Sequence, residues 1–297
     1  MRRTSDRRFL AGFAHEAALG DVTDAGSLPP AVAGVNAVVH AAGLVKARNE
    51  AEFDAVNAAG TANLLAAMDE AAPGLQRFVY VSSLAAHGPS PDGRPRPADS
   101  PPNPVTAYGR SKLRGEEMVR LWSGSKRAVI IRPSVIYGPR DPALLPFFKL
   151  ARFRLAPLLM GGRNHVSVVY ADDAARAVAQ AATAEADVAG KTYFLDDGNV
   201  YTWRDLLAAV EEAVGRRAIS LSSPRWAYHF AALLSEAYGF FRRRAVSLTR
   251  EKVLEMSQPF WVCSHDELRR DLGWSPEVGL QEGARLTAAW YREQGWL

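Results

Sequence analysis

FVYVSS, residues 78–83, decides the fold class of this chain. Its β-branched and aromatic residues predict a short buried strand, and its two serines mark the carboxyl end of that strand. Similar apolar runs occupy residues 36–41, 128–132, 166–170 and 192–195, and segments with helical periodicity alternate with them at 51–72, 107–122, 144–154 and 172–183. This alternation predicts an α/β fold in which helices cover both faces of a doubly wound parallel sheet.

The same pattern sets the domain organisation. A stretch rich in Pro, Gly, Asp and Ser at 88–104 predicts an exposed loop that leads into Tyr108. Later the pattern becomes mostly helical, beginning with Thr202 as a helix cap and Asp205 in the first turn. We therefore expect a sheet domain over 1–200, with some insertions of a second lobe after 140. A smaller, mostly helical lobe on the substrate side is expected over 201–297.

Composition narrows the class of protein. The 297 residues carry 36 Lys and Arg against 32 Asp and Glu, without a basic block, so nucleic acid is not expected as a partner. The single cysteine, Cys263, cannot form an internal disulfide and is expected in the core. No apolar run reaches the roughly 18 residues of a membrane span, and the first residues lack a signal peptide, so we expect a cytoplasmic protein.

One helical segment raises the question of a membrane surface. Between residues 226 and 241, seven apolar residues fall on one helical face, and Arg242, Arg243 and Arg244 follow. We expect this face to pack in the core of the second lobe or to line an apolar substrate site. Docking on a membrane surface is the less favoured alternative, and a homodimer is left open.

The segment 108–112, Tyr-Gly-Arg-Ser-Lys, carries the predicted chemistry. Its spacing of four places the Tyr108 phenol and the Lys112 ammonium on one helical face, one turn apart. A free tyrosine titrates near pH 10, so it needs a nearby positive charge before it can exchange protons with a substrate hydroxyl at neutral pH. Random pairing gives roughly 0.2 such Tyr–Lys pairs in a chain of this composition, so the spacing alone is weak evidence.

Ser83 supplies the context that the spacing lacks. Ligands of open α/β sheets bind at the carboxyl ends of strands, so Ser83 can reach the same substrate oxygen as Tyr108. The alternative for Ser82 or Ser83 is a structural role in a strand-end turn. Together, Ser83, Tyr108 and Lys112 predict hydride transfer between a nicotinamide cofactor and a substrate carbon that bears oxygen.

Several further motifs accompany this group in a fixed order. They are Gly20-Asp-Val22, Val38-Val-His-Ala-Ala-Gly43, Asn57-Ala-Ala-Gly-Thr61, Arg132-Pro133, Tyr137-Gly-Pro139 and Tyr170-Ala-Asp-Asp173. With these motifs the chain resembles the extended short-chain dehydrogenases/reductases, which include the NAD-dependent epimerase/dehydratase and 3β-hydroxysteroid dehydrogenase branches. The resemblance implies a Rossmann-like domain and an NAD(P)-dependent oxidoreductase.

The resemblance also implies roles for residues outside the catalytic group. By position, Asp21 and Val22 would meet the adenine, Asn57 would support the catalytic site, and the cofactor would be lined by Ala41, Ala42, Gly43, Tyr108, Lys112, Pro133, Ser134 and Val135. The structural alternatives are a turn for Asp21, a helix cap for Asn57, and helix-starting charges for Asp172 and Asp173. Arg2 and Arg3 near the ribose position favour NADP slightly over NAD, and a solvated terminus is the alternative for these two residues. No metal site is expected.

The start of the chain departs from the family. Members begin with a strand, a glycine-rich turn and a helix that holds the pyrophosphate, whereas Gly12 and Gly20 here are too far apart for such a turn. We expect Met1 to enter at the end of the second family strand, another strand to form near 16–19, and a gap in the sheet between that strand and 36–41. Our hypothesis is that a strand–helix–strand unit of roughly 30 or more residues precedes Met1 in a longer enzyme. Repair of residues 1–30 into another pairing is the alternative.

Two departures bear on the substrate. Nucleotide-sugar branches carry an Arg where this chain has Val166, and dehydratases carry an acidic pair where this chain has Leu84-Ala-Ala86. The expected function is therefore oxidoreduction of a lipophilic or small hydroxylated metabolite, with Tyr108 as the acid/base. The alternatives are a nucleotide-sugar epimerase and a catalytically silent protein that senses NAD(P) or acts as a scaffold.

Overall fold

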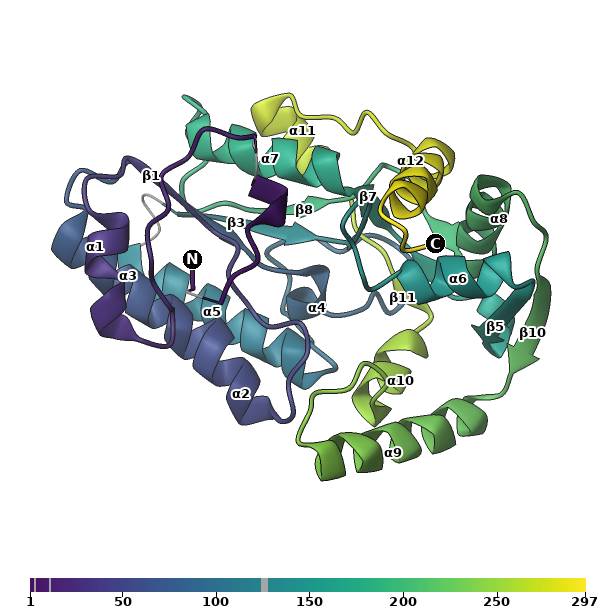
Figure 1. The fold of residues 1–297 in the computed structure, drawn as a ribbon. Coiled ribbons are helices and arrows are strands. Elements are labelled where there is room, and N and C mark those ends of the chain that lie inside the picture. The colour runs from purple at the N-terminus through teal and green to yellow at the C-terminus, as the bar shows by residue number, and fades with distance from the viewer. Residues whose placement is uncertain (3, 11, 124–127) are drawn as a thin grey trace.

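A computed structural model describes residues 1–2, 4–10, 12–123 and 128–297 (Figure 1). The strands are β1 (Ala37–His40), β2 (Arg77–Val81), β3 (Ala128–Pro133), β4 (Val135–Tyr137), β5 (Leu155–Leu159), β6 (His165–Val166), β7 (Val168–Tyr170), β8 (Thr192–Leu195), β9 (Tyr201–Thr202), β10 (Ile219–Ser223) and β11 (Phe260–Trp261). The helices are α1 (Pro29–Val32), α2 (Glu50–Asp54), α3 (Gly60–Ala71), α4 (Leu84–His87), α5 (Ala107–Ser123), α6 (Leu145–Arg152), α7 (Ala171–Thr183), α8 (Trp203–Val214), α9 (Arg225–Arg242), α10 (Arg250–Met256), α11 (Asp266–Leu272) and α12 (Leu280–Glu293).

The main sheet has the parallel order β1-β2-β3-β8. Alternate residues of β2 enter two different cores. Phe78 and Tyr80 pack with α1, α3 and α5, while Val79 packs with α7 and α11 on the other side. Helices therefore cover both faces of the sheet, as Figure 1 shows. The doubly wound parallel fold is confirmed.

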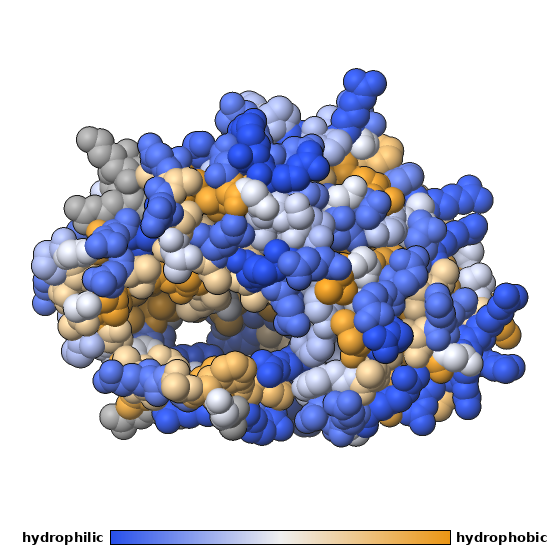
Figure 2. Space-filling model, turned by 90° about the horizontal axis from the view of Figure 1, so that it is seen from above, coloured by the Kyte–Doolittle hydropathy of each residue, from blue (hydrophilic) through white to orange (hydrophobic). Residues whose placement is uncertain are grey.

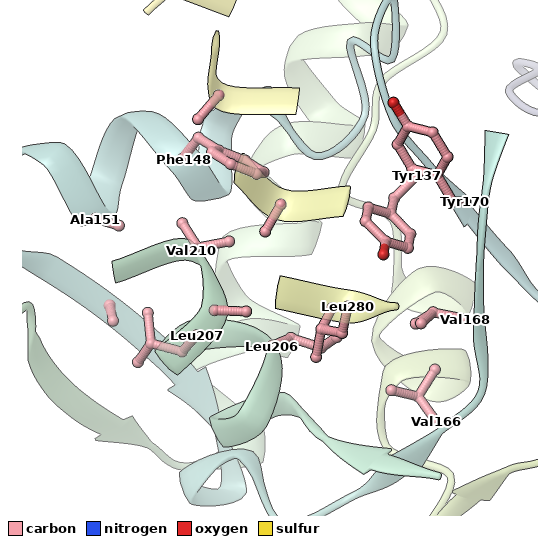
Figure 3. Packing of buried hydrophobic residues seen from close by; sticks show 14 of the residues in the cluster. Tyr137, Phe148, Ala151, Val166, Val168, Tyr170, Leu206, Leu207, Val210 and Leu280 are labelled. Carbon is pink, nitrogen blue, oxygen red and sulfur yellow. The ribbon is translucent and has the colours of Figure 1, made fainter. Parts of the chain in front are cut away.

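A second core holds the second lobe together (Figure 3). Phe148 of α6, Val210 of α8 and Leu280 of α12 belong to one buried cluster with Tyr137 and Tyr170. Residues 144–170 thus pack with the later helices, whereas α11 packs back on the main sheet. The boundary at residue 200 remains a prediction, because segments on each side of it contribute to both cores.

The prediction of one continuous strand of the main sheet at 166–170 is wrong, because two separate strands form there and both lie outside that sheet. Ser167 divides this segment into β6, which pairs with β9 and β11, and β7, which pairs with β4. The Ser167 backbone N–H donates to Trp261 O at 2.8 Å, so its hydrogen bonds point away from the main sheet. An apolar run identifies a buried strand but does not choose its neighbours.

The strand expected near 16–19 is also wrong. Those residues are exposed and lie outside the strands of the described chain. β1 pairs only with β2 among the described residues, and Val39 of β1 is 44% exposed. Figure 2 shows an opening bordered by apolar atoms on the side of the molecule that carries β1 and the N-terminal segment in Figure 1. The sheet therefore has a free edge instead of an internal gap.

The helix expected at 226–241 forms as α9, but its predicted packing is wrong. Phe230 is 59% exposed and Phe241 is 81% exposed, while only Ala232 and Gly239 of this helix are buried. The helix is amphipathic, yet its apolar side faces solvent. No described helix combines the length and apolar character that crossing a membrane requires.

Three smaller expectations have mixed outcomes. Thr202 caps α8 and shares a capping box with Asp205, as predicted. Cys263 is buried, also as predicted, and burial raises the pKa of its thiol. The loop at 88–104 is irregular, but Ser90 and Ala98 within it are buried, so the expectation of a wholly exposed loop is wrong.

Candidate active site

The carboxyl end of β2 places two serines in different environments. Ser82 points inward and donates to Glu116 Oε1 at 2.6 Å, so its role is structural. Ser83 is half-buried and caps α4 by accepting the Ala85 N–H at 3.1 Å. A cap fixes the side chain of Ser83, because its oxygen satisfies a free N–H at the start of the helix.

Tyr108 lies in the first turn of α5, which packs against α4, the helix that Ser83 caps. Burial raises the pKa of the Tyr108 phenol, the Ser83 hydroxyl opposes this rise, and the Glu255 carboxylate adds to it. The resting phenol is therefore protonated at neutral pH. A protonated phenol beside a serine hydroxyl can donate to a carbonyl oxygen.

Lys112 lies one turn further along α5 and is buried. Its ammonium donates to Val81 O at 2.7 Å and lies 4.3 Å from the centre of the Tyr80 ring. Desolvation lowers the pKa of Lys112 to about 8, although the Glu116 carboxylate opposes the change. The positive charge is thus held at the end of β2, and the ammonium remains mostly charged at neutral pH.

Asn57 is fully buried within a π-helical turn, Ala55–Ala59, between α2 and α3. Its side chain accepts the Leu44 N–H at 2.7 Å and donates to Leu44 O and to Ser111 Oγ. Asn57 therefore fastens the loop after β1 to α5, and the helix-cap interpretation is wrong because Asn49 caps α2. π-turns inside helices often mark functional sites.

The loop after β1 is open to solvent next to this group. Ala41, Ala42 and Gly43 are exposed. A Cβ at Gly43 would lie 3.0 Å from Asn57 Oδ1 and 3.8 Å from Lys112 Nζ. Because Gly43 has no side chain, the space beside Asn57 and Lys112 is open, and backbone or ligand atoms can come close to Lys112.

Asp21 and Val22 lie beside the amino end of α3. The Asp21 carboxylate accepts the backbone N–H and the hydroxyl of Thr23, which lowers its pKa, so the turn interpretation of Asp21 is confirmed. Val22 packs against Gly60, where a Cβ would meet Val22 Cγ2 at 2.8 Å. Contact of these two residues with adenine remains a prediction.

Residues 133–135 connect β3 to β4 at the same end of the sheet. Ser134 is buried, and its Oγ has no hydrogen-bond partner within the described parts of the chain. Pro133 ends β3 and Val135 is half-buried. An unpaired buried hydroxyl is costly, so it is a polar group available to a ligand.

A buried polar network behind Ser83 was missed by the sequence analysis. Arg132 binds both oxygens of Glu116, at 2.9 and 2.7 Å, and also donates to Ala98 O and to His87 Nδ1. Burial lowers the pKa of His87 to about 4, so the ring is neutral and accepts at Nδ1. The signal was present, because Glu116 continues the spacing of four from Tyr108 and Lys112.

Asp172 and Asp173 start α7, as one interpretation predicted. Asp173 does more than complement the helix dipole, since it accepts the backbone N–H groups of Glu277 and Val278 at 3.0 and 2.9 Å. This carboxylate ties α7 to the segment before α12. Its role in the described structure is positional.

The residues fit one half of a nicotinamide cofactor. The open approach at Gly43, the unpaired Ser134 hydroxyl and the buried Lys112 ammonium converge where parallel strands end, which is where such sheets bind nucleotides. These residues would hold the nicotinamide and its ribose. The pyrophosphate half has no glycine-rich turn before β1 in this sequence. Arg2 contributes to lowering the pKa of Asp21, whereas Arg3 lies outside the described residues.

Comparison with known proteins bears on this site. Residues 1–195 match the model of the NAD dependent epimerase/dehydratase family. The chain is 30% identical to the ceramide reductase of Caulobacter vibrioides over 100% of this chain and 87% of that protein. It is 31% identical to the 2-alkyl-3-oxoalkanoate reductase of Stenotrophomonas maltophilia over 91% and 84% of the two chains. The crystal structure of gox2253 is 28% identical, with a TM-score of 0.81 over 100% of this chain and 90% of that chain.

The fold, the ordered motifs and these matches agree with one another. The family match extends from the N-terminal segment to the end of β8, and so includes Ser83, Tyr108 and Lys112. The chain belongs to the NAD-dependent epimerase/dehydratase family and is an oxidoreductase of the extended short-chain dehydrogenase/reductase type.

Proposed function

We propose that this protein reduces a ketone on a lipophilic, long-chain substrate with a reduced nicotinamide cofactor. The observation that carries the proposal is that Tyr108, a protonated phenol, stands one turn from the buried Lys112 on α5, which packs against the helix that Ser83 caps. A site prepared to donate a proton suits reduction of a carbonyl. Relatives named as a ceramide reductase and a 2-alkyl-3-oxoalkanoate reductase support a lipophilic ketone or alcohol as the substrate class.

The proposed reaction needs one hydride and one proton. Gly43, Lys112 and Ser134 would hold the reduced nicotinamide, which would supply the hydride. Tyr108 transfers its phenolic proton to the carbonyl oxygen, while Ser83 donates a hydrogen bond to that oxygen and orients the carbonyl. The positive charge of Lys112 stabilises the phenolate that remains, and solvent then restores the proton to Tyr108.

The surroundings do not suit a nucleotide sugar. Val166, at the position where those family branches carry an Arg, is buried in the core of the second lobe. It therefore offers no cation to a diphosphate. The residues after Ser83 are Leu84, Ala85 and Ala86, so this helix carries no acid for a dehydration step.

The substrate class can be tested by following nicotinamide absorbance with a long-chain 3-oxoacyl compound. We expect turnover with this ketone, and a loss of about 10²-fold in kcat for Ser83→Ala, because one hydrogen bond to the developing oxyanion is removed. Protection against heat by a UDP-sugar, without ketone turnover, would favour an epimerase. Absence of both, with cofactor bound, would favour a silent sensor.

The proposed preference for NADP over NAD is tested by comparing the KM values for NADPH and NADH between the native chain and Arg2→Gln.

A pH profile tests the role of Lys112. The pKa of this ammonium is lowered to about 8, so it is charged below that pH and neutral above it. Because loss of the charge removes stabilisation of the phenolate, kcat/KM for ketone reduction should be flat below pH 8 and fall above it. Lys112→Arg is the control, since a guanidinium keeps its charge and should remove this inflection. A native profile that stays flat well above pH 8 would contradict the role given to Lys112.

A further inference from the structure

α9 presents its apolar residues to solvent instead of to the protein. At 100° per residue, the buried Ala232 and Gly239 share the side that packs against the chain after the helix, whereas Phe230, Ala237 and Phe241 lie on the opposite side of the helix. The exposed apolar residues cover a continuous arc of about 160°. This arc, called here the outer face of α9, consists of Trp226, Phe230, Leu233, Leu234, Ala237, Tyr238, Phe240 and Phe241.

The attachment of α9 fixes this orientation. A Cβ at Gly239 would lie 2.8 Å from both Arg244 O and Val246 Cγ1, so the chain after the helix folds back against the inner face. At the other end, Tyr228 donates its hydroxyl to Pro157 O at 3.0 Å. Rotation of the outer face inward would break both contacts. A continuous exposed apolar patch of this kind marks an interaction surface.

The charges around α9 indicate the kind of partner. Residues 215–249 contain six arginines and a single acid, Glu236. That acid is already paired with Arg250 at 2.7 Å. Arg225 precedes the outer face, and Arg242, Arg243 and Arg244 follow it, all exposed. An apolar face with arginines at both ends suits a bilayer surface that carries anionic headgroups.

The same charges disfavour a second copy of the chain as the partner. In a twofold contact, each surface meets itself, so antiparallel α9 helices would bring Arg225 of one copy to the arginine cluster of the other. The only acid in this region is engaged within its own chain. Like charges would therefore meet without compensation at both ends of such a contact.

The outer face also borders a groove beside the loop that follows β1. The groove has a volume of about 1090 Å³ and is lined by residues 47–49 of the loop after β1 and by Leu233, Ala237 and Phe240 of α9. Lys46 donates to Ser247 Oγ at 2.7 Å, which joins this loop to the chain after α9. Arg250 of α10 also lines the groove, and the next residue, Glu251, accepts the Ala107 N–H, next to Tyr108.

We propose that the outer face of α9 docks on the surface of an anionic lipid bilayer and opens the adjoining groove to the membrane. The helix lies in the headgroup region with its arginines on phosphates, and a lipophilic substrate reaches the site without crossing water. The route of the substrate rests on the proposed function, whereas docking of α9 does not. An experiment can therefore contradict the docking of α9 without contradicting the proposed function, and the reverse.

Co-sedimentation of the full chain with vesicles tests the docking. The native protein should sediment with vesicles of phosphatidylglycerol and phosphatidylcholine, and less with phosphatidylcholine alone. Phe230→Ser with Phe241→Ser should weaken binding by roughly tenfold or more, because two large apolar side chains leave the interface. Arg242→Gln with Arg244→Gln should weaken binding to anionic vesicles by roughly fivefold for each arginine. Leu121→Ser is the matched control, since Leu121 is 78% exposed on α5 and should leave binding unchanged.

The proposal is overturned if the native protein does not bind anionic vesicles, or if the Phe230→Ser and Phe241→Ser variant binds as well as the Leu121→Ser control. A native dimer that this variant converts to monomers, without vesicle binding, would overturn it in favour of self-association. Turnover of a short, water-soluble ketone should be the same in all variants. Vesicle binding without any ketone turnover would retain the docking surface and remove the proposed reaction.

Discussion

Tyr108→Phe is expected to lower kcat for ketone reduction by about 10³-fold, because the phenyl ring cannot donate the proton that the carbonyl oxygen requires. The ring itself remains in place against Phe53, whose ring centre lies 5.9 Å away, so the site should keep its shape. Binding of the cofactor should change by less than about threefold, since the lost interaction acts on the reacting oxygen. Steady-state rates from nicotinamide absorbance measure both effects.

Tyr193→Phe is the matched control for this experiment. Its hydroxyl donates to Asp271 Oδ2 at 2.8 Å, on the side of β8 that faces α11. The substitution removes a tyrosine hydroxyl and one hydrogen bond without changing the candidate site. We expect an almost native rate for Tyr193→Phe. A native rate for Tyr108→Phe as well would show that Tyr108 is not the proton donor.

Glu116→Gln should lower the free energy of unfolding by about 3 kcal/mol, because it leaves the buried Arg132 guanidinium without its counter-charge. Glu116 is fully buried, and Arg132, Ser82 and Arg120 all donate to its two oxygens. An amide presents an NH₂ group to donors that need an acceptor, so at least one of these bonds is lost. Urea unfolding of the two proteins measures the difference.

Glu117→Gln provides the comparison on the same helix. Glu117 is exposed next to the buried acid, so the identical chemical change should alter the unfolding free energy by less than about 0.5 kcal/mol. Equal unfolding midpoints for Glu116→Gln and Glu117→Gln would contradict the importance of the buried pair. A loss of rate in Glu116→Gln beyond its loss of folded protein would show that the network also positions Ser83.

The sequence was informative where local rules act alone. Strand and helix periods predicted β2, β3 and β8, and α5 begins at the predicted residue 107. The spacing of four between Tyr108 and Lys112 predicted their shared helical face, since that face follows from helix geometry alone. The motif order was enough to indicate the family. These features depend on residues close together in the chain.

Contacts between distant residues required the tertiary structure. Asn57 bonds to Leu44 and Ser111, and Arg132 bonds to Glu116 across the sheet and α5. The spacing of four places Glu116 on the helical face of Tyr108 and Lys112, but no local pattern identifies its distant partner Arg132. The same reason explains the error at 166–170, where β6 and β7 find partners in chain segments far away.

By itself, the sequence of this protein determined the strands of the main sheet and indicated Ser83, Tyr108 and Lys112 as the group to which we assign the chemistry. Only the tertiary structure decided the direction in which α9 points its apolar side. The period of a helix shows that an apolar face exists, and the remainder of the fold decides whether that face is covered. Here the inner side of α9 is occupied by the chain around Arg244 and Val246, so the apolar side remains exposed.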